Sequence, residues 1–361
     1  MAEGNSLYDE IGSEINEALQ MSGKSLEERY MHLARAEEMI LKQDNSSVLD
    51  NFLDEMVQFI HEKEQKIHPE VFKRAIATLS WALTDQSGGV IIQKKAINTC
   101  TQLYPVLLRW ASQKRSTDDE AKNCWETFSM LKNKIMQTVD SENEGIKTMA
   151  FKFLEMLIIC QLPKTEVCGG FSETPRASNQ QISLDKIGRD SFISWRQLQS
   201  EAIKSFNSLI EHMASTHITS LNLVTAISST CNIARQRPEK MADVVSALEQ
   251  LHLNLPPTLG TSQVKSVRKE LKMHLLRMMK HPGSFTLHNL HARINQLLIE
   301  LGATPSEIQK EMPGPNEIDA ALKRRLAAAT AARKLQQTES RTDEKPSRKK
   351  PHSSSLVQTA Q

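Results

Sequence analysis

The sequence predicts an all-α protein, a HEAT/ARM-type helical-repeat solenoid of paired antiparallel helices. Three observations favour this fold class. Apolar residues recur at helical spacing along most of the 361 residues, capping or breaking residues separate the periodic segments, and the helices follow one another in pairs with short polar links. Helices of this length are marginally stable alone, so each must pack on its neighbours in the stack.

The N-terminal part of the chain predicts four amphipathic helices. They extend from Ile11 to Leu19, from Ser25 to Ile40, from Val48 to Ile60 and from Pro69 to Leu83. Ser25 and Glu28 match a capping box, and Pro69 suits the first position of a helix. We assign residues 1–43 to an N-terminal helical repeat and expect the solenoid proper to occupy residues 44–313.

A long helix is predicted from Val90 to Ala111. Pro105 lies inside it and should kink its axis, because proline lacks an amide donor and clashes with the preceding turn. Capping boxes for the two helices that follow are predicted at Thr117 with Glu120 and at Ser141 with Glu144.

Helical spacing lapses between residues 162 and 190, where Gly, Ser, Thr, Pro and Asn predominate. An irregular segment of this length is uncommon inside a compact domain, so we expect a surface loop. Helical spacing then resumes, with apolar positions at Phe192, Trp195, Leu198, Ala202, Phe206, Leu209 and Ile210.

Three helices in series are predicted between Ser220 and His281, separated by Pro238 and by Pro256 and Pro257. Thr261 or Ser262 is the expected cap of the third. The expected buried stripes are Leu221, Val224, Ile227, Cys231 and Ala234 in the first helix, Met241, Val244, Val245, Leu248, Leu251 and Leu255 in the second, and Val264, Val267, Leu271, Leu275 and Met278 in the third.

A last paired helix is predicted from Phe285 to Leu301, followed by a short turn that Thr304, Pro305 and Glu307 cap. Residues 314–361 are rich in Ala, Lys and Arg, and we expect a basic, mostly disordered tail there. Its short basic clusters fit a nuclear import signal as well as a solubilising role.

Composition narrows the class of protein. The net charge is only +2, so the chain as a whole has no strong electrostatic reason to bind nucleic acid. The five cysteines are an odd number and fall mostly within helical patterns, which favours a reducing compartment over a disulfide framework. The polar N-terminus and the short apolar runs predict neither a signal peptide nor a membrane span.

Catalytic motifs are not found in the sequence. It lacks a phosphate-binding loop, a nucleophile elbow and cysteine pairs with zinc-ligand spacing, so we expect a non-enzyme without cofactor or metal. His288 and His291 have no further ligand at a known spacing. Cys160 and Cys231 are expected to be buried apolar residues, and the carboxylates at Asp50, Asp54 and Glu55 are expected to form a solvated helix face.

The helix from Asn143 to Cys160 suggests a surface for protein binding. Its core face is expected to include Phe153, and the opposite arc mixes charged and apolar residues. In paired-helix solenoids the second helix of each pair lines a concave groove. The candidate partner-binding residues are Thr148, Phe151, Lys152, Glu155 and Ile159, with Asn98 and Gln102 on the preceding second helix. From spacing alone, a solvated lysine is the favoured interpretation of Lys152.

Several strings in the sequence resemble the N-terminal domain of the symplekin family, scaffold proteins of messenger RNA 3′-end processing. They are "LDNFLDE", "TQLY", "GIKTMAFKF", "ISLDKIGRD", "NIARQRP", "LHLNLPPTL", "SQVKSVRKELKMHLL" and "KHP". The resemblance covers roughly residues 44–313. It implies a HEAT solenoid that acts as a nuclear adaptor and whose groove, including Lys152, holds the phosphatase of the RNA polymerase II C-terminal repeats beside cleavage and polyadenylation factors.

The chain departs from the family pattern in two places. It is shorter by about one helix between "LDNFLDE" and "GGVIIQKKAI", and it ends in a basic tail where family members continue. It is therefore either a fragment or a short relative. A generic helical-repeat adaptor with a different partner remains the alternative. Direct RNA contact through the tail should be weak and salt-dependent, because aromatic stacking residues are absent there.

Overall fold

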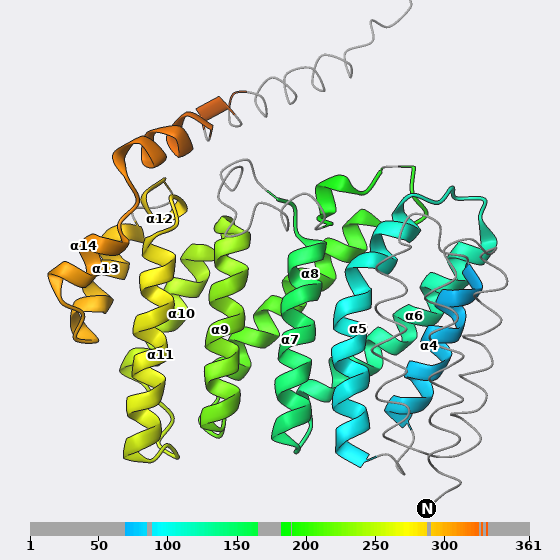
Figure 1. The fold of residues 1–361 in the computed structure, drawn as a ribbon, viewed down its shortest axis with the longest axis horizontal. Coiled ribbons are helices and arrows are strands. Elements are labelled where there is room, and N and C mark those ends of the chain that lie inside the picture. Colours follow the sequence, from blue (N-terminus) through cyan, green and yellow to red (C-terminus); the bar gives the residue numbers. More distant parts are fainter. Residues whose placement is uncertain are drawn as a thin grey trace, which may run out of the picture.

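A computed structural model describes residues 69–84, 89–164, 182–188, 190–286, 290–324, 326–327 and 330. Within these residues the chain forms helices joined by turns and contains no strand, so the predicted all-α solenoid is confirmed (Figure 1). The helices predicted before residue 69, the repeat at residues 1–43 and most of the 162–190 loop lie outside the described residues.

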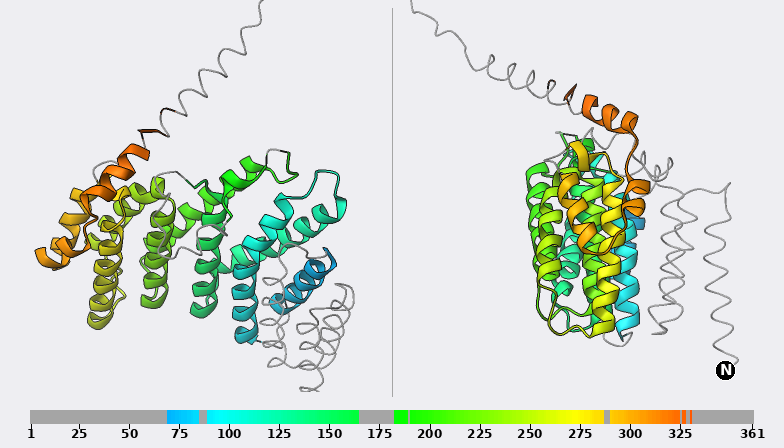
Figure 2. Two further views of the ribbon diagram at one scale, coloured as in Figure 1. Left: turned by 45° about the horizontal axis from the view of Figure 1, so that its top comes forward. Right: turned by 90° about the vertical axis from the view of Figure 1, so that its left-hand side faces the viewer.

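The helices form two layers (Figures 1 and 2). The first layer contains α5 (Gly89–Ser112), α7 (Glu144–Gln161), α9 (Ser220–Gln236) and α11 (Thr261–Met279), and each packs against the next in the row. The second contains α4 (Pro69–Thr84), α6 (Asp119–Gln137), α8 (Trp195–Met213) and α10 (Met241–Leu253). Successive helices from α4 to α10 pack across the two layers, which is the arrangement of a helical-repeat stack.

Short elements complete the described chain. They are the 3₁₀ turns η2 (Thr138–Asp140), η4 (Leu184–Lys186) and η5 (Pro238–Lys240), and the helices α12 (Gly283–Thr286), α13 (Leu290–Glu300) and α14 (Pro305–Glu311). α13 packs on α10 and α11, and α14 packs on α11, so both layers extend by one element.

Within the range of the helix predicted from Phe285 to Leu301, the structure describes the end of α12 and the whole of α13, and residues 287–289 between them lie outside the described residues. Ser284, in α12, donates hydrogen bonds from its hydroxyl to the carbonyl oxygens of Met279 and His281, at 3.2 and 2.9 Å. The single turn of α12 therefore satisfies carbonyl groups at the end of α11, which a helix otherwise leaves without partners.

The N-caps of α6 and α7 are Asp118 and Asn143, and not the predicted Thr117 and Ser141. Each cap side chain accepts a hydrogen bond from the amide three residues further on, at 2.9 and 3.1 Å. Asp and Asn are among the strongest N-capping residues, so they outcompete the hydroxyl side chains nearby.

α11 begins after Gly260, and not after the predicted caps Thr261 or Ser262. The amide of Gly260 donates to Oε1 of Gln263 at 2.8 Å, so the glutamine side chain supplies the bond that fixes the start of this helix. The capping box predicted for α14 is confirmed.

Most predicted apolar stripes match the observed core. The stripes of α10 and α11 are buried, except for half-buried positions at their ends. The stripe of α9 is wrong at its start, because Leu221 is 52% exposed while Asn222 is buried. Trp195 of α8 is likewise 42% exposed. α9 packs against α7, α11, α8 and α10, so its burial is set by neighbours on several sides and not by one apolar stripe.

A buried polar network ties four helices together within the core. Lys132 of α6 forms an ion pair with Glu201 of α8 at 2.6 Å. The side-chain amide of Gln161 donates to Glu201 at 2.5 Å and to the hydroxyl of Tyr104 at 2.7 Å. Because Lys132, Gln161 and Tyr104 are buried and Glu201 is only 19% exposed, the partners offset a desolvation cost that would otherwise be several kcal/mol.

The end of the predicted surface loop belongs to the core. Ile182, Leu184 and Ile187 are buried, and the amide of Leu184 donates to the carbonyl oxygen of Leu162 at 3.3 Å. The expectation of a surface loop is therefore wrong for residues 182–187. The reason is that apolar residues at the end of the loop pack back onto α7 and α8, which composition alone did not reveal.

The tail predicted from residue 314 begins with a helix. Residues 315–324 are helical, and Ala321 is fully buried. Glu317 accepts a hydrogen bond from the amide of Gly314 at 3.1 Å, which stabilises the start of this helix. The basic composition of the tail reveals neither this cap nor the packing of Ala321. Most of the remaining tail lies outside the described residues.

Arg237 closes the C-terminal end of α7. The residue is only 2% exposed, and its guanidinium donates to the carbonyl oxygens of Leu162, at 3.1 Å, and of Ile159. The last carbonyl groups of a helix lack intrahelical partners and carry its negative dipole end, so a buried cation satisfies both their hydrogen bonds and their charge.

We predict that Arg237→Ala lowers the free energy of unfolding by about 3 kcal/mol, because it leaves buried carbonyl groups without donors. Urea denaturation of the two proteins measures the difference. The matched control is Arg196→Ala at the exposed start of α8, which should change stability by less than about 0.5 kcal/mol. Equal effects of the two substitutions would show that Arg237 does not hold α7.

A second prediction concerns His281, which is buried and accepts a hydrogen bond at Nδ1 from the amide of Gly283 at 3.0 Å. Burial, and then the charge of Arg235, lower the pKa of His281 to about 4. The unfolded chain binds this proton at its ordinary pKa of about 6.5, so stability is full above that pH and is lost as pH falls toward 4.

We expect this histidine to contribute about 1 to 2 kcal/mol of acid destabilisation between pH 6.5 and pH 4. His281→Asn keeps an acceptor for Gly283 but cannot be protonated, so unfolding measured across this range should depend less on pH. His217→Asn, at an exposed position, is the control and should leave the pH dependence unchanged. An unaltered slope in the His281 variant would contradict the assignment.

Candidate protein-binding site

The candidate site lies on α7, in the middle of the first layer between α5 and α9 (Figure 1). α7 also packs on α8 and α6 of the second layer, so little of its surface remains accessible. The accessible arc contains Thr148, Lys152 and Glu155, none of which is fully buried. These three residues were predicted from the sequence to share this arc.

Lys152 and Glu155 form an ion pair along the helix, with 2.9 Å between Nζ and Oε2. The two side chains differ in exposure. Lys152 is 42% exposed, whereas Glu155 is 12% exposed. The lysine therefore exposes its charge and part of its aliphatic stem to solvent, while the glutamate lies deeper at the seam with α9.

α9 supplies the residues that hold Glu155. The hydroxyl of Ser229 donates to Oε2 of Glu155 at 2.6 Å, and the side-chain amide of Asn232 donates to Oε1. A further bond joins the hydroxyl of Thr148 to Oδ1 of Asn222 at 2.9 Å. The seam between α7 and α9 is thus a row of hydrogen bonds that fixes the position of the Lys152 arc.

Sequence analysis missed these α9 residues. Asn222, Ser229 and Asn232 recur at spacings of seven and three residues, which places them on one face of a helix. Polar residues in this pattern within an otherwise apolar helix were the available signal. The apolar residues of α9 form the stronger pattern in its sequence and conceal this polar one.

Phe151 and Ile159 were predicted at the edge and on the arc of the site, and both predictions are wrong. Phe151 is fully buried and Ile159 is buried. The ring of Phe151 lies 5.5 Å from that of His212 on α8, and the neighbours of α7 in both layers cover positions that a half-exposed helix would leave open. Neither side chain can contact a partner while the stack is intact.

Asn98 and Gln102 are exposed on α5, one helical turn apart. α5 packs beside α7, so they belong to the same layer as Lys152. α5 is a single helix through Pro105. Both residues stay predicted contact residues of the candidate surface.

The described residues offer little for catalysis. Burial raises the pKa of Cys160 and of Cys231 to about 12, so their thiols are inert as nucleophiles at neutral pH. In the described ranges no group of three or more His, Cys, Asp or Glu side chains is placed to hold a metal ion. His291 packs its ring 4.0 Å from Phe285, whereas His288 lies outside the described residues.

A membrane span is not found either. None of the helices that the structure describes combines the length and the apolar character needed to cross a bilayer.

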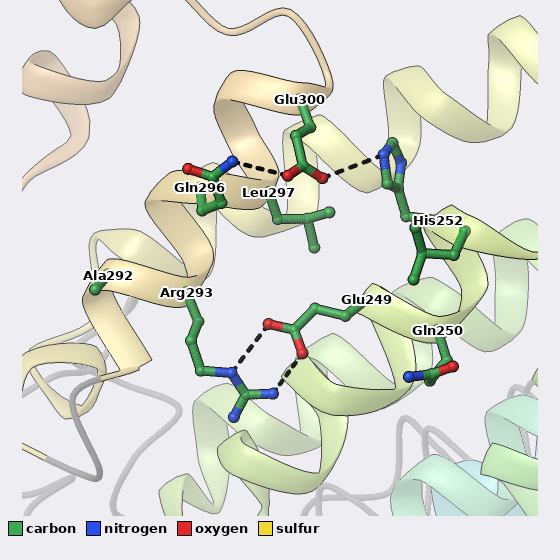
Figure 3. A pocket seen from close by; sticks show the side chains of 9 residues that line it. Glu249, Gln250, His252, Ala292, Arg293, Gln296, Leu297 and Glu300 are labelled. Atoms are coloured by element: carbon green, nitrogen blue, oxygen red, sulfur yellow. Dashed lines mark hydrogen bonds and ion pairs between the residues drawn. The ribbon is translucent and has the colours of Figure 1, made fainter.

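A hollow in the second layer was not predicted from the sequence. It has a volume of about 500 Å³ and lies between α10 and α13 (Figure 3). Arg293 forms a bidentate ion pair with Glu249, and Nε2 of His252 lies 3.5 Å from Oε2 of Glu300. Because Arg293 and Glu249 are paired with each other, the hollow offers mainly shape and the apolar side chain of Leu253, which is 72% exposed.

Residues 89–325 match the family model described as Symplekin/PTA1 N-terminal. The chain belongs to this family. The matched range includes α5 to α14 and therefore the whole candidate site. The predicted resemblance is confirmed over this range, although it was expected to begin further upstream.

The chain is also similar to a named protein of fission yeast. The chain is 24% identical over 251 residues to the mRNA cleavage and polyadenylation specificity factor complex subunit pta1 of Schizosaccharomyces pombe. That alignment covers 66% of this chain and 35% of pta1, so the chain spans about a third of the length of this relative.

Two engineered proteins of known crystal structure are also similar. One is 16% identical with a TM-score of 0.39 and covers 81% of this chain and 97% of its own. The other is 16% identical with a TM-score of 0.35 and covers 86% of this chain and 96% of its own.

We predict that Glu155→Ala lowers the free energy of unfolding by about 2 kcal/mol, because Ser229 and Asn232 lose their shared acceptor at a buried seam. Chemical denaturation measures the change. Glu126→Ala, which removes an exposed carboxylate from α6, should change stability by less than about 0.5 kcal/mol. If the two variants unfold alike, the seam does not depend on Glu155.

Proposed function

We propose that this protein is a non-catalytic nuclear adaptor in messenger RNA 3′-end processing. Membership of the Symplekin/PTA1 N-terminal family supports this function. The name of the fission yeast relative, a subunit of a cleavage and polyadenylation complex, supports cleavage and polyadenylation factors as partners.

The partner that we propose for the candidate site is the phosphatase of the RNA polymerase II C-terminal repeats. It would dock on the first-layer face around Lys152, which we expect to be the concave face of the solenoid. The observation that carries the proposal is the accessible Lys152, held in place by Glu155 and the α9 seam within the family segment "GIKTMAFKF". A charged side chain fixed in one position loses little conformational entropy on binding.

Two neighbouring residues test this proposal. Lys152→Ala should weaken binding to the purified phosphatase by about 1 to 3 kcal/mol, as expected for a central contact, with little change in melting temperature. Phe153 is fully buried, so Phe153→Ala should cost about 3 to 5 kcal/mol of stability through the cavity it leaves. Calorimetric titration and thermal melts measure the two effects.

The matched control for binding is Lys134→Ala, an exposed lysine on α6 in the second layer. It should bind the phosphatase like the unmodified protein. Unchanged binding by Lys152→Ala would show that the phosphatase does not bind this arc of α7. Recovery of stable partners from nuclear extract that include neither a phosphatase nor a polyadenylation factor would favour the alternative, a generic helical-repeat adaptor with another partner.

A further inference from the structure

Two neighbouring hollows lie beside α10 in the second layer. The first is the hollow between α10 and α13, with a volume of about 500 Å³ (Figure 3). The second lies between α8 and α10 and has a volume of about 340 Å³. Gln250 of α10 is exposed and lines both hollows. The two hollows therefore form one surface that crosses α10, which is called the α10 surface below.

The second hollow is lined mainly by apolar side chains. Its polar lining consists of the side-chain amides of Gln250 and Asn254, so none of the residues that line it is charged. The apolar lining comes from the C-terminal parts of α8 and α10 and comprises Ile210, Met213, Ala214, Ala247 and Leu251. Such a hollow suits an apolar side chain of a partner, because contact buries apolar surface and desolvates no charge.

Apolar side chains are also exposed beside the first hollow. Leu253, at the end of α10, lines this hollow and is exposed. Ile299 of α13 is exposed too, and it lies seven residues after Ala292, which lines the hollow. At 100° per residue, Ile299 and Ala292 share one face of α13. Exposed apolar side chains that gather at a hollow indicate a surface for another protein, whereas scattered ones do not.

The separation of the two hollows fits a helix laid across α10. α8 and α13 both pack on α10, so the hollows lie on either side of it and are about one helix width, ~10 Å, apart. Seven residues of an α-helix also span about 10 Å. An extended peptide fits less well, because the described residues contain no strand whose edge it could join.

The first hollow has one carboxylate that no lysine or arginine of its lining neutralises (Figure 3). Arg293 is paired with Glu249 through two hydrogen bonds. Glu300 is exposed, accepts a bond from the side-chain amide of Gln296 at 2.8 Å and lies 3.5 Å from Nε2 of His252. The amide is uncharged, and His252 is charged only when it is protonated. With His252 neutral, a basic side chain of a partner complements Glu300.

We propose that the α10 surface binds an amphipathic helix of a partner protein, with two apolar side chains seven residues apart and a lysine or arginine beside one of them. Each apolar side chain would occupy one hollow, and the basic side chain would pair with Glu300. The ion pair between Arg293 and Glu249 would stay intact. The proposal concerns the second layer and does not rest on the phosphatase.

Selection from a displayed library of random peptides of about 16 residues, which allow more than four helical turns, tests the proposal. The library is first depleted on the double variant Leu253→Ser with Ala214→Trp, in which one apolar contact is lost and the second hollow is filled. The remaining peptides are then selected on the unmodified protein. We expect the enriched peptides to carry apolar residues seven positions apart together with lysine or arginine.

Fluorescence anisotropy with an enriched peptide measures the contribution of each group. Leu253→Ser and Ala214→Trp should each weaken binding about tenfold or more, as expected for central contacts. Glu300→Gln should weaken it about threefold, because an exposed ion pair contributes less. A proline placed between the two apolar residues of the peptide should abolish binding, since it breaks a helix.

The matched controls make the same replacements elsewhere. They are Met130→Ser and Glu126→Gln at exposed positions of α6 and Ala320→Trp at an exposed position after α14. Each should alter peptide affinity by less than about twofold, and so should Lys152→Ala. Circular dichroism verifies that each variant is folded. If Ala214→Trp unfolds the protein, Leu253→Ser replaces an exposed side chain and provides the deciding comparison, with the library depleted on that single variant.

The proposal is overturned if no peptide survives depletion and selection, if the enriched peptides are acidic, or if the proline variant binds equally well. Sedimentation of the protein alone tests a second copy as the occupant, because a dimer that Leu253→Ser dissociates would assign the surface to self-association. Binding of a synthetic peptide of residues 331–361 that Leu253→Ser abolishes would assign it to this chain's own tail. Either result overturns the proposal. No phosphatase takes part, so failure here leaves the proposed function standing.

Discussion

Burial of the C-terminal end of α7 is the constraint on which the rest of the structure depends. Helix ends expose carbonyl groups that need hydrogen-bond donors, and at this end Ile159, Gln161 and Leu162 are buried. Arg237, which follows α9, donates to the carbonyl oxygens of Ile159 and Leu162. The end of α7 and the turn after α9 are thereby fixed relative to each other. Leu184 reaches the same carbonyl of Leu162 and brings the end of the loop onto the core.

The fixed positions of α7 and α9 determine which side chains the candidate site exposes. With α7 and α9 held side by side, Glu155 lies within reach of Ser229 and Asn232, and Lys152 is the exposed charge of the arc. This arrangement positions charged and polar side chains on a surface fixed by hydrogen bonds between α7 and α9. That property suits an adaptor, and it agrees with the Symplekin/PTA1 N-terminal family to which the chain belongs.

The two layers differ in how their charges are arranged. In the second layer, the hollow between α10 and α13 is bordered by charges paired with each other, such as Arg293 with Glu249. In the first layer, Lys152 of α7 is paired with Glu155, whereas Lys269 and Arg277 of α11 are exposed. Paired charges cost a ligand the energy of breaking them, whereas an excess of one sign attracts a complementary partner.

The sequence by itself determined the fold class, the order of the helices and the family, because apolar spacing and capping residues are local properties of the chain. It also predicted the arc of Thr148, Lys152 and Glu155. Only the tertiary structure decided that Phe151 and Ile159 are buried, that Asn222, Ser229 and Asn232 complete the seam, and that Arg237 closes α7. Helical spacing tells which residues share a face, but the stack sets how many neighbours cover it. Bonds such as that between Thr148 and Asn222, 74 positions apart, join residues whose proximity no local pattern encodes.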